Sequence, residues 1–130
     1  MSFRIALLTA GLAPLAACGD SCGNQVVART DAPDGRHSAV MFQRDCGATT
    51  GFSTQISVVE RGAEPRGTAN AFRADTSRGA ATAGPWGGPW AEMSWRGEST
   101  LLVRYARGSR IFAQEGQVAG VTIHYQEVAR

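Results

Sequence analysis

The sequence predicts an all-β fold, a small antiparallel β-sandwich or barrel of about eight short strands. Three observations predict it. Apolar and polar residues alternate with a period of two in several segments. Clusters of Gly, Pro, Asp and Ser separate these segments every 8 to 15 residues or so, a spacing typical of sandwiches and barrels. No segment after residue 18 offers three good turns of helix.

The alternation is clearest in residues 52–60, where Phe52, Thr54, Ile56 and Val58 share one face. Before it, Asp31-Ala32-Pro33-Asp34-Gly35 is a strong turn signal. After it, residues 75–89 are rich in Gly, Ala and Pro and show no periodicity, and Gly116 and Gly120 bound a second loop. The remaining predicted strands are 25–30, 37–44, 70–74, 92–95, 101–105, one that begins at Ile111, and 121–125.

The first residues indicate a targeting segment. Arg4 precedes an uncharged apolar run from Ile5 to Leu15. A spanning helix needs about 20 apolar residues, so this run is too short to cross a membrane but has the length of a signal-peptide core. Pro14 would break a helix near the end of the run and leave an extended segment for a peptidase.

Leu15-Ala16-Ala17-Cys18 resembles the lipobox of bacterial lipoprotein precursors. The resemblance implies removal of residues 1–17 as a signal peptide and acylation of Cys18, which would anchor the chain to a lipid bilayer through several acyl chains. Gly19 follows the cysteine where Asp would favour inner-membrane retention, so the expected location is the periplasmic face of the cell envelope, on the outer rather than the inner membrane. The expected organisation is then a lipidated linker over residues 18–24 and one β domain over residues 25–130.

Cys22 and Cys46 are the two remaining cysteines, and an exported chain meets oxidising conditions, so they are expected to form a disulfide. A bridge across 24 positions would stabilise the domain by about 3.5 kcal/mol if it is unstrained. The alternative is a catalytic thiol at Cys46, beside Asp45, with His37 or His124 as its base. No motif in the sequence brings a histidine near Cys46.

Composition and charge exclude several classes of function. The net charge is +2, all 13 basic residues are Arg, and they are scattered along the chain, so nucleic acid is not an expected partner. The sequence has no CxxC, HxxxH or HExxH spacing, and no metal or cofactor is expected.

Two segments are candidate binding sites. Residues 44–55, with the sequence Arg-Asp-Cys-Gly-Ala-Thr-Thr-Gly-Phe-Ser-Thr-Gln, resemble a segment of small uncharacterised bacterial proteins, over roughly Asp34 to Val59 with a weaker echo from Trp95 to Tyr125. The resemblance implies a fold and no mechanism. The amides and hydroxyls around Thr49, Thr50 and Phe52 either hold an anion or satisfy their own hairpin backbone.

The second segment is Gly84-Pro85-Trp86-Gly87-Gly88-Pro89-Trp90. Trp86 and Trp90 either form a recognition patch for a protein, glycan or peptide, or fold back and cover an open end of the sandwich. The leading expectation for function is a non-enzymatic envelope module that binds a protein or a surface. The alternative is a small enzyme or ligand binder centred on Cys46 and the Thr/Gly-rich loop after it.

Overall fold

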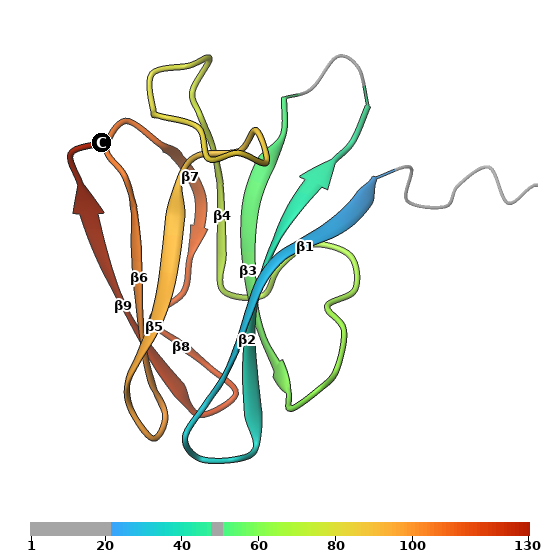
Figure 1. The fold of residues 1–130 in the computed structure, drawn as a ribbon, viewed down its shortest axis with the longest axis vertical. Coiled ribbons are helices and arrows are strands. Elements are labelled where there is room, and N and C mark those ends of the chain that lie inside the picture. Colours follow the sequence, from blue (N-terminus) through green and yellow to red (C-terminus); the bar gives the residue numbers. More distant parts are fainter. Residues whose placement is uncertain (1–21, 48–50) are drawn as a thin grey trace, which may run out of the picture.

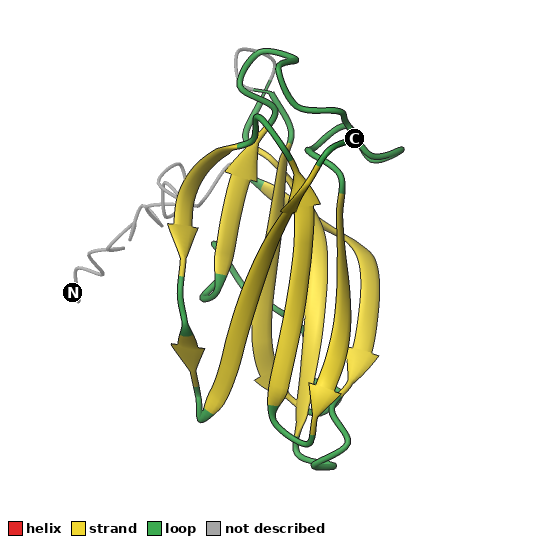
Figure 2. Ribbon diagram, turned by 90° about the vertical axis from the view of Figure 1, so that its left-hand side faces the viewer, coloured by secondary structure: helices red, strands yellow, loops and turns green. Residues whose placement is uncertain are grey.

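A computed structural model describes residues 22–47 and 51–130. In these residues the protein is all-β without a helix, and two sheets pack face to face as a sandwich (Figure 1, Figure 2), which confirms the predicted fold class. The predicted signal peptide, Cys18, Thr49 and Thr50 lie outside the described residues. The nine strands of this part are β1 (Gly23–Asp31), β2 (His37–Asp45), β3 (Ser53–Glu60), β4 (Phe72–Asp75), β5 (Ala91–Gly97), β6 (Thr100–Ala106), β7 (Arg110–Gln114), β8 (Gln117–Val118) and β9 (Val121–Val128).

The first sheet has the order β1-β2-β3-β4-β7 and is antiparallel throughout, whereas the second sheet has the order β5-β6-β9-β8. The second sheet departs from the expected antiparallel arrangement, because β6 and β9 pair in parallel. After β6 the chain crosses to the first sheet as β7 and returns through β8, so β9 runs in the same direction as β6. Parallel neighbours need such a crossover connection.

Two strand boundaries differ from the sequence analysis. β1 begins at Gly23, two residues before the predicted start of the domain at residue 25. The loop expected between Gly116 and Gly120 contains β8, a strand of only two residues that pairs with the start of β9. A strand this short shows no alternation, which is why periodicity did not detect it.

The core lies between the inner faces of the two sheets. Phe72 of β4 is fully buried there, and its ring centre lies 5.5 Å from that of Tyr105 and 5.8 Å from that of Tyr125, which come from the second sheet. Burial of one large apolar side chain stabilises the fold by about 1.5–3 kcal/mol. The other buried core residues are Ala39, Met41, Ile56, Val58, Ala71, Ala74, Ala91, Leu101, Val103, Val121 and Ile123.

The outer face of the first sheet is also covered over part of its area. Val40 and Phe42 of β2 point away from the core and are nevertheless fully buried. The segment 61–70 lies over them, held by hydrogen bonds from the Ala69 amide to Gln55 Oε1 (2.9 Å) and from the Asn70 amide to Ser57 Oγ (3.2 Å). The expectation of a single buried face for residues 52–60 is therefore too simple.

Candidate functional site

Cys22 and Cys46 form a disulfide, as predicted, and it joins the start of β1 to the end of β2. We call this end of the sandwich the disulfide end. Because the Cys46 sulfur is bonded, it is not a thiolate nucleophile. His37 begins β2, about 26 Å of extended strand away from its last residue, and His124 is exposed on the second sheet. The structure thus does not assemble the alternative thiol–histidine site.

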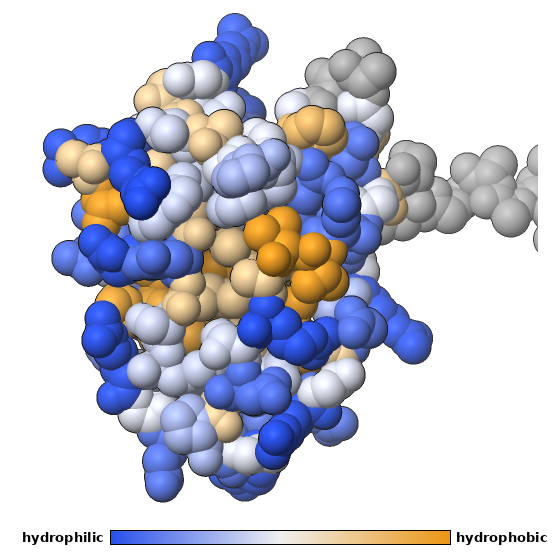
Figure 3. Space-filling model, in the orientation of Figure 1, coloured by the Kyte–Doolittle hydropathy of each residue, from blue (hydrophilic) through white to orange (hydrophobic). Residues whose placement is uncertain are grey.

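Two predicted site residues, Phe52 and Trp86, come together at the disulfide end. They line an open hollow of about 650 Å³ beside β1, which we call the aromatic hollow. Phe52 is 41% exposed and Val26 is 45% exposed, so apolar surface faces solvent here. Figure 3 shows hydrophobic side chains gathered over β1. The described residues that line it are Gln25, Val26, Val27, Gln43, Phe52, Pro85, Trp86 and Gly87.

The Trp86 loop is fastened to the end of the core. Trp86 Nε1 donates to Thr54 Oγ1 (2.8 Å), and Thr54 Oγ1 donates to the Pro89 carbonyl (2.7 Å). Gly87 has a φ of +92°, and a Cβ on it would lie 2.4 Å from Phe52 Cδ2. Trp86 also packs against the core cluster, so the loop both covers the open end and presents one side to the hollow.

Trp90 does not join this site. It is half-buried, and the Arg130 guanidinium stacks 4.0 Å from the centre of its ring. The two tryptophans therefore do not form one patch, because Trp86 lines the aromatic hollow and Trp90 contacts Arg130. A cation over an aromatic face is a stabilising contact that needs no ligand.

A second hollow, the arginine cavity, lies on the outer face of the first sheet, beyond the segment that covers Val40 and Phe42. It has a volume of about 510 Å³ and shares Phe52 with the aromatic hollow. The lining residues are Arg44, Cys46, Gly51, Phe52, Ser53, Gln55, Arg73, Asp75, Thr76, Arg78, Arg110 and Phe112.

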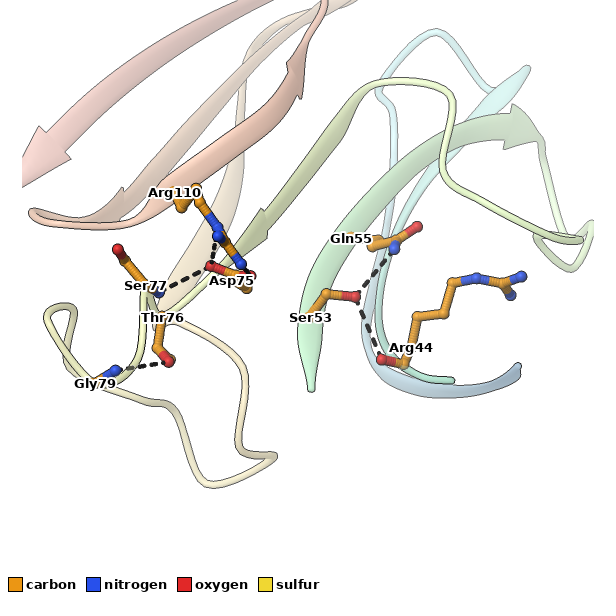
Figure 4. Close-up of polar contacts among 8 residues, drawn as sticks. All are labelled: Arg44, Ser53, Gln55, Asp75, Thr76, Ser77, Gly79 and Arg110. Atoms are coloured by element: carbon orange, nitrogen blue, oxygen red, sulfur yellow. Dashed lines mark hydrogen bonds and ion pairs between the residues drawn. The ribbon is translucent and has the colours of Figure 1, made fainter. Parts of the chain in front are cut away.

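Strand register builds the floor of the arginine cavity. Ser53 pairs with Arg44 on one side and with Asp75 on the other, and Asp75 pairs with Arg110, so the four residues form one row across β2, β3, β4 and β7. Gln55 and Arg73 form part of the next row. Figure 4 shows this set: Gln55 Nε2 donates to Ser53 Oγ (3.0 Å), which lies 3.3 Å from the Arg44 carbonyl.

Asp75 and Arg110 form an ion pair at the edge of the arginine cavity. Arg110 Nε lies 3.1 Å and 3.2 Å from the two carboxylate oxygens of Asp75, and Nη2 donates to Oδ2 (Figure 4). This hydrogen bonding by Arg110 lowers the pKa of Asp75 and raises that of Arg110. The pair therefore stays charged and cancels one of the arginine charges.

A tight turn after β4 carries the fourth arginine, Arg78, to the rim of the arginine cavity. Asp75 Oδ1 accepts from the Ser77 amide (2.8 Å), and Thr76 Oγ1 accepts from the Gly79 amide (3.2 Å). Ser77 and Arg78 have positive φ angles of 50° and 58°. Non-glycine residues in this region cost about 1–3 kcal/mol each and persist only where their surroundings hold them. The turn thus holds Arg78 at the cavity in an unfavourable backbone conformation.

Two cavity arginines are not neutralised. Arg73 Nε is buried without a hydrogen-bond partner among the described residues, and such an unmet donor costs about 1–3 kcal/mol. Neither Arg73 nor Arg78 forms an ion pair within residues 22–47 and 51–130. Arg44 is 4% exposed and donates to Asn24 Oδ1 (2.6 Å), and Figure 4 shows its guanidinium turned away from Asp75.

The arginine cavity corrects the expectation that the basic residues are merely scattered. They are scattered in sequence, but four of the 13 line one cavity, and Asp75 is the only acidic residue among the described residues that line it. The sequence carried one usable signal, because Arg73 and Asp75 alternate with Phe72 and Ala74 and so had to lie on the outer face. The sequence does not indicate the strand order that brings Arg110 beside Arg73 and Asp75.

Groups of three or more His, Cys, Asp or Glu residues able to hold a metal ion do not occur in the described part of the chain. That part also contains no helix long and apolar enough to span a bilayer. Comparisons with protein-family models, with curated proteins and with solved structures gave no significant match to this chain.

Proposed function

We propose that this chain is the precursor of a lipid-anchored protein of the bacterial cell envelope. In this proposal residues 1–17 are removed, Cys18 is acylated, and the β-sandwich is a non-enzymatic module that binds another envelope protein. The support for the address is the apolar run followed by Leu15-Ala16-Ala17-Cys18. The disulfide between Cys22 and Cys46 is consistent with export, because such bonds persist outside the cytoplasm.

The observation that carries the binding role is the aromatic hollow. Val26 and Phe52 are exposed beside Trp86 at the end of the domain nearest the predicted anchor. The hollow is beside β1, an edge strand that pairs only with β2. Exposed aromatic side chains around an open hollow are typical of the anchor points of protein interfaces. The partner we propose is an envelope protein that places an apolar side chain in this hollow.

The proposed cleavage and acylation at Cys18 are tested by the intact mass of the mature protein from the producing bacterium. The expected mass starts at Cys18, includes the acyl groups and lacks two hydrogens for the disulfide. A soluble chain that retains Met1 would contradict the proposal.

The binding role is tested by a photo-crosslinking amino acid placed at Val26 in the living cell. We expect one defined adduct that is lost when Phe52→Ser is added and absent when the crosslinker replaces Glu98, which is exposed at the opposite end. The same adducts from positions 26 and 98 would contradict a binding role for the hollow.

The alternative function is a small enzyme or ligand binder centred on Cys46 and the loop after it. With Cys46 in a disulfide, its thiol-nucleophile form has no free sulfur. Its ligand-binding form is favoured by a specific observation, because Cys46, Gly51, Phe52 and Ser53 all line the arginine cavity.

A further inference from the structure

We propose that the arginine cavity binds the phosphate group of an anionic membrane lipid. The phosphate would lie against Arg73 and Arg78, with Arg110 held beside them by Asp75. The choice of a lipid as the source of this phosphate rests on the proposed acylation of Cys18. The site itself rests on the described residues alone.

Charge is the first argument. The cavity lining holds four arginines and one aspartate, which is a formal charge of +3, whereas the whole chain carries only +2. Asp75 neutralises Arg110, and Arg44 donates to Asn24. Arg73 and Arg78 line the cavity, and neither pairs with a carboxylate of residues 22–47 or 51–130. Clefts lined by one sign of charge concentrate ions of the opposite sign.

Hydrogen bonding is the second argument. Arg73 Nε is a buried donor with no acceptor in the described residues. A guanidinium presents several donors in a planar fork that matches the oxygens of a phosphate. Arg73 lines the cavity, so a rotation of its guanidinium would let an oxyanion there supply the missing acceptor. Such an oxyanion would also explain why the strained turn that carries Arg78 is retained at this rim.

The rim of the cavity favours an amphiphile over a free ion. Phe52 is 41% exposed and Phe112 is 56% exposed, and both line the cavity. Arg110 stacks on the Phe112 ring, with its guanidinium carbon 5.0 Å from the ring centre. A free phosphate would gain nothing from these rings, whereas the glycerol and acyl groups of a lipid would contact them. Aromatic side chains are common where proteins meet the interface of a bilayer.

Chain length brings the cavity to the membrane. Cys46 lines the cavity and is bonded to Cys22, which is four residues after Cys18. Four residues reach at most about 14 Å when fully extended. If Cys18 carries acyl chains, the arginine cavity cannot move far from the lipid headgroups. Arginines at that distance are attracted by anionic lipids.

The test uses the processed, full-length mature chain in liposomes and measures arginine modification by phenylglyoxal, residue by residue, with mass spectrometry. One set of liposomes contains only phosphatidylcholine, and the other contains phosphatidylglycerol as well. Inorganic phosphate added to the phosphatidylcholine set separates a free ion from a lipid headgroup. Arg96 is the internal control, because it is exposed on β5 of the second sheet and does not line the cavity.

We expect phosphatidylglycerol to slow modification of Arg73 and Arg78 by about tenfold or more, while Arg96 changes little. Arg73→Gln should abolish the protection of Arg78, and Arg96→Gln should preserve it. Arg73 makes no ion pair in the described residues, so its variant is expected to fold, which the thermal unfolding midpoint checks. Phe112→Ser should weaken protection by lipid but not by inorganic phosphate.

Equal modification rates in the two sets of liposomes would overturn the proposal, as would equal protection of Arg96. Protection by inorganic phosphate as strong as that by phosphatidylglycerol would overturn the lipid assignment. An intact mass without acyl groups would contradict the anchoring, whereas protection of Arg73 by phosphatidylglycerol in that same chain would still support the site.

Discussion

The two ends of the sandwich are closed in different ways. At the opposite end from the disulfide, which we call the turn end, the β1–β2 connection is closed mostly by contacts between residues close in sequence, and one long-range hydrogen bond from the Asp34 amide to the Glu98 carbonyl (3.2 Å) joins it to the second sheet. Asp34 Oδ1 accepts from the amides of Arg36 (2.7 Å) and His37 (3.1 Å), and the Gly35 amide donates to the Ala32 carbonyl (3.1 Å). An aspartate that bonds its own turn in this way stabilises the turn through neighbours in the chain.

At the disulfide end the closing contacts join residues far apart in sequence. Thr54 and Pro89 are 35 positions apart, Thr54 and Trp86 are 32 apart, and the two cysteines are 24 apart. The Gln43 side chain, 43 positions from Trp86, donates to its carbonyl. Both hollows that we connect with function lie at this end. The comparison teaches that the β1–β2 turn closes mainly through local contacts, whereas the Trp86 loop and the aromatic hollow depend on contacts between residues far apart in sequence.

From this comparison we expect removal of the disulfide to lower the free energy of unfolding more than any other change considered below. Replacement of both Cys22 and Cys46 by Ala should lower the free energy of unfolding by about 3.5 kcal/mol, because the unfolded chain regains the freedom of a 24-residue separation. Urea unfolding of the variant measures this value. A loss below about 1 kcal/mol would show that the long-range contacts hold the disulfide end without the bridge.

The next largest loss of stability is expected at Gly87, where the backbone lies close to the ring of Phe52. Gly87→Ala should cost about 2–3 kcal/mol, because φ is +92° and the new Cβ would meet Phe52. Gly62→Ala is the matched control: φ is +81°, nothing lies within 4 Å, and only about 1 kcal/mol should be lost. Equal losses in the two variants would show that Phe52 moves aside freely and that the aromatic hollow is not fixed.

A smaller loss is expected at the hydroxyl that ties the Trp86 loop to β3. Thr54→Val keeps the shape of the side chain but leaves Trp86 Nε1 without its acceptor and the Pro89 carbonyl without its donor. We expect a loss of about 2 kcal/mol and a red shift of tryptophan fluorescence. Thr54→Ser retains the hydroxyl and should keep the native emission spectrum, and a shift in both variants would assign the effect to packing instead.

The smallest expected effect is a dependence of stability on pH, which comes from one carboxylate at each end of the sandwich. At the turn end, the hydrogen bond from His37 and that from the Arg36 amide lower the pKa of Asp34 below its ordinary 3.8, and at the disulfide end Arg110 does the same for Asp75. The unfolded chain therefore binds more protons than the folded chain below about pH 4. Stability from these groups is present above that pH and is lost as the pH falls through the lowered pKa values.

Asp34→Asn and Asp75→Asn should each flatten part of the acid limb of a plot of unfolding free energy against pH. A greater effect of Asp34→Asn would place the acid-sensitive contact at the turn end. An acid limb unchanged in both variants would contradict the assignment to these two carboxylates.

Sequence reasoning succeeded where the information is local. The turn at Asp31 to Gly35 and the strand over residues 52–60 each depend on neighbours in the chain, and both were predicted, although both faces of that strand are buried rather than one. The disulfide followed from the count of cysteines and the expected compartment. Phe52 and Trp86 were each identified as candidates, but their meeting in one hollow depends on how the Trp86 loop folds back over 34 positions.

The arginine cavity could not have been predicted. Alternation places a side chain on one face of a strand but does not say which strand lies next to it. Arg110 faces Asp75 because the chain leaves the second sheet after β6 and pairs with β4 as β7, and the same crossing makes β6 and β9 parallel. No local pattern in the chain specifies that exchange between the sheets.

The parallel pairing of β6 with β9 also sets when the protein can fold. β9 is the only neighbour of β8 and lies between it and β6, so the second sheet is reduced to the β5–β6 hairpin until residues 121–128 have been made. Isolated hairpins are marginal in water. A chain synthesised from its N-terminus therefore stays incompletely folded until the ribosome has passed this strand, and the export that we propose would require such an incompletely folded chain.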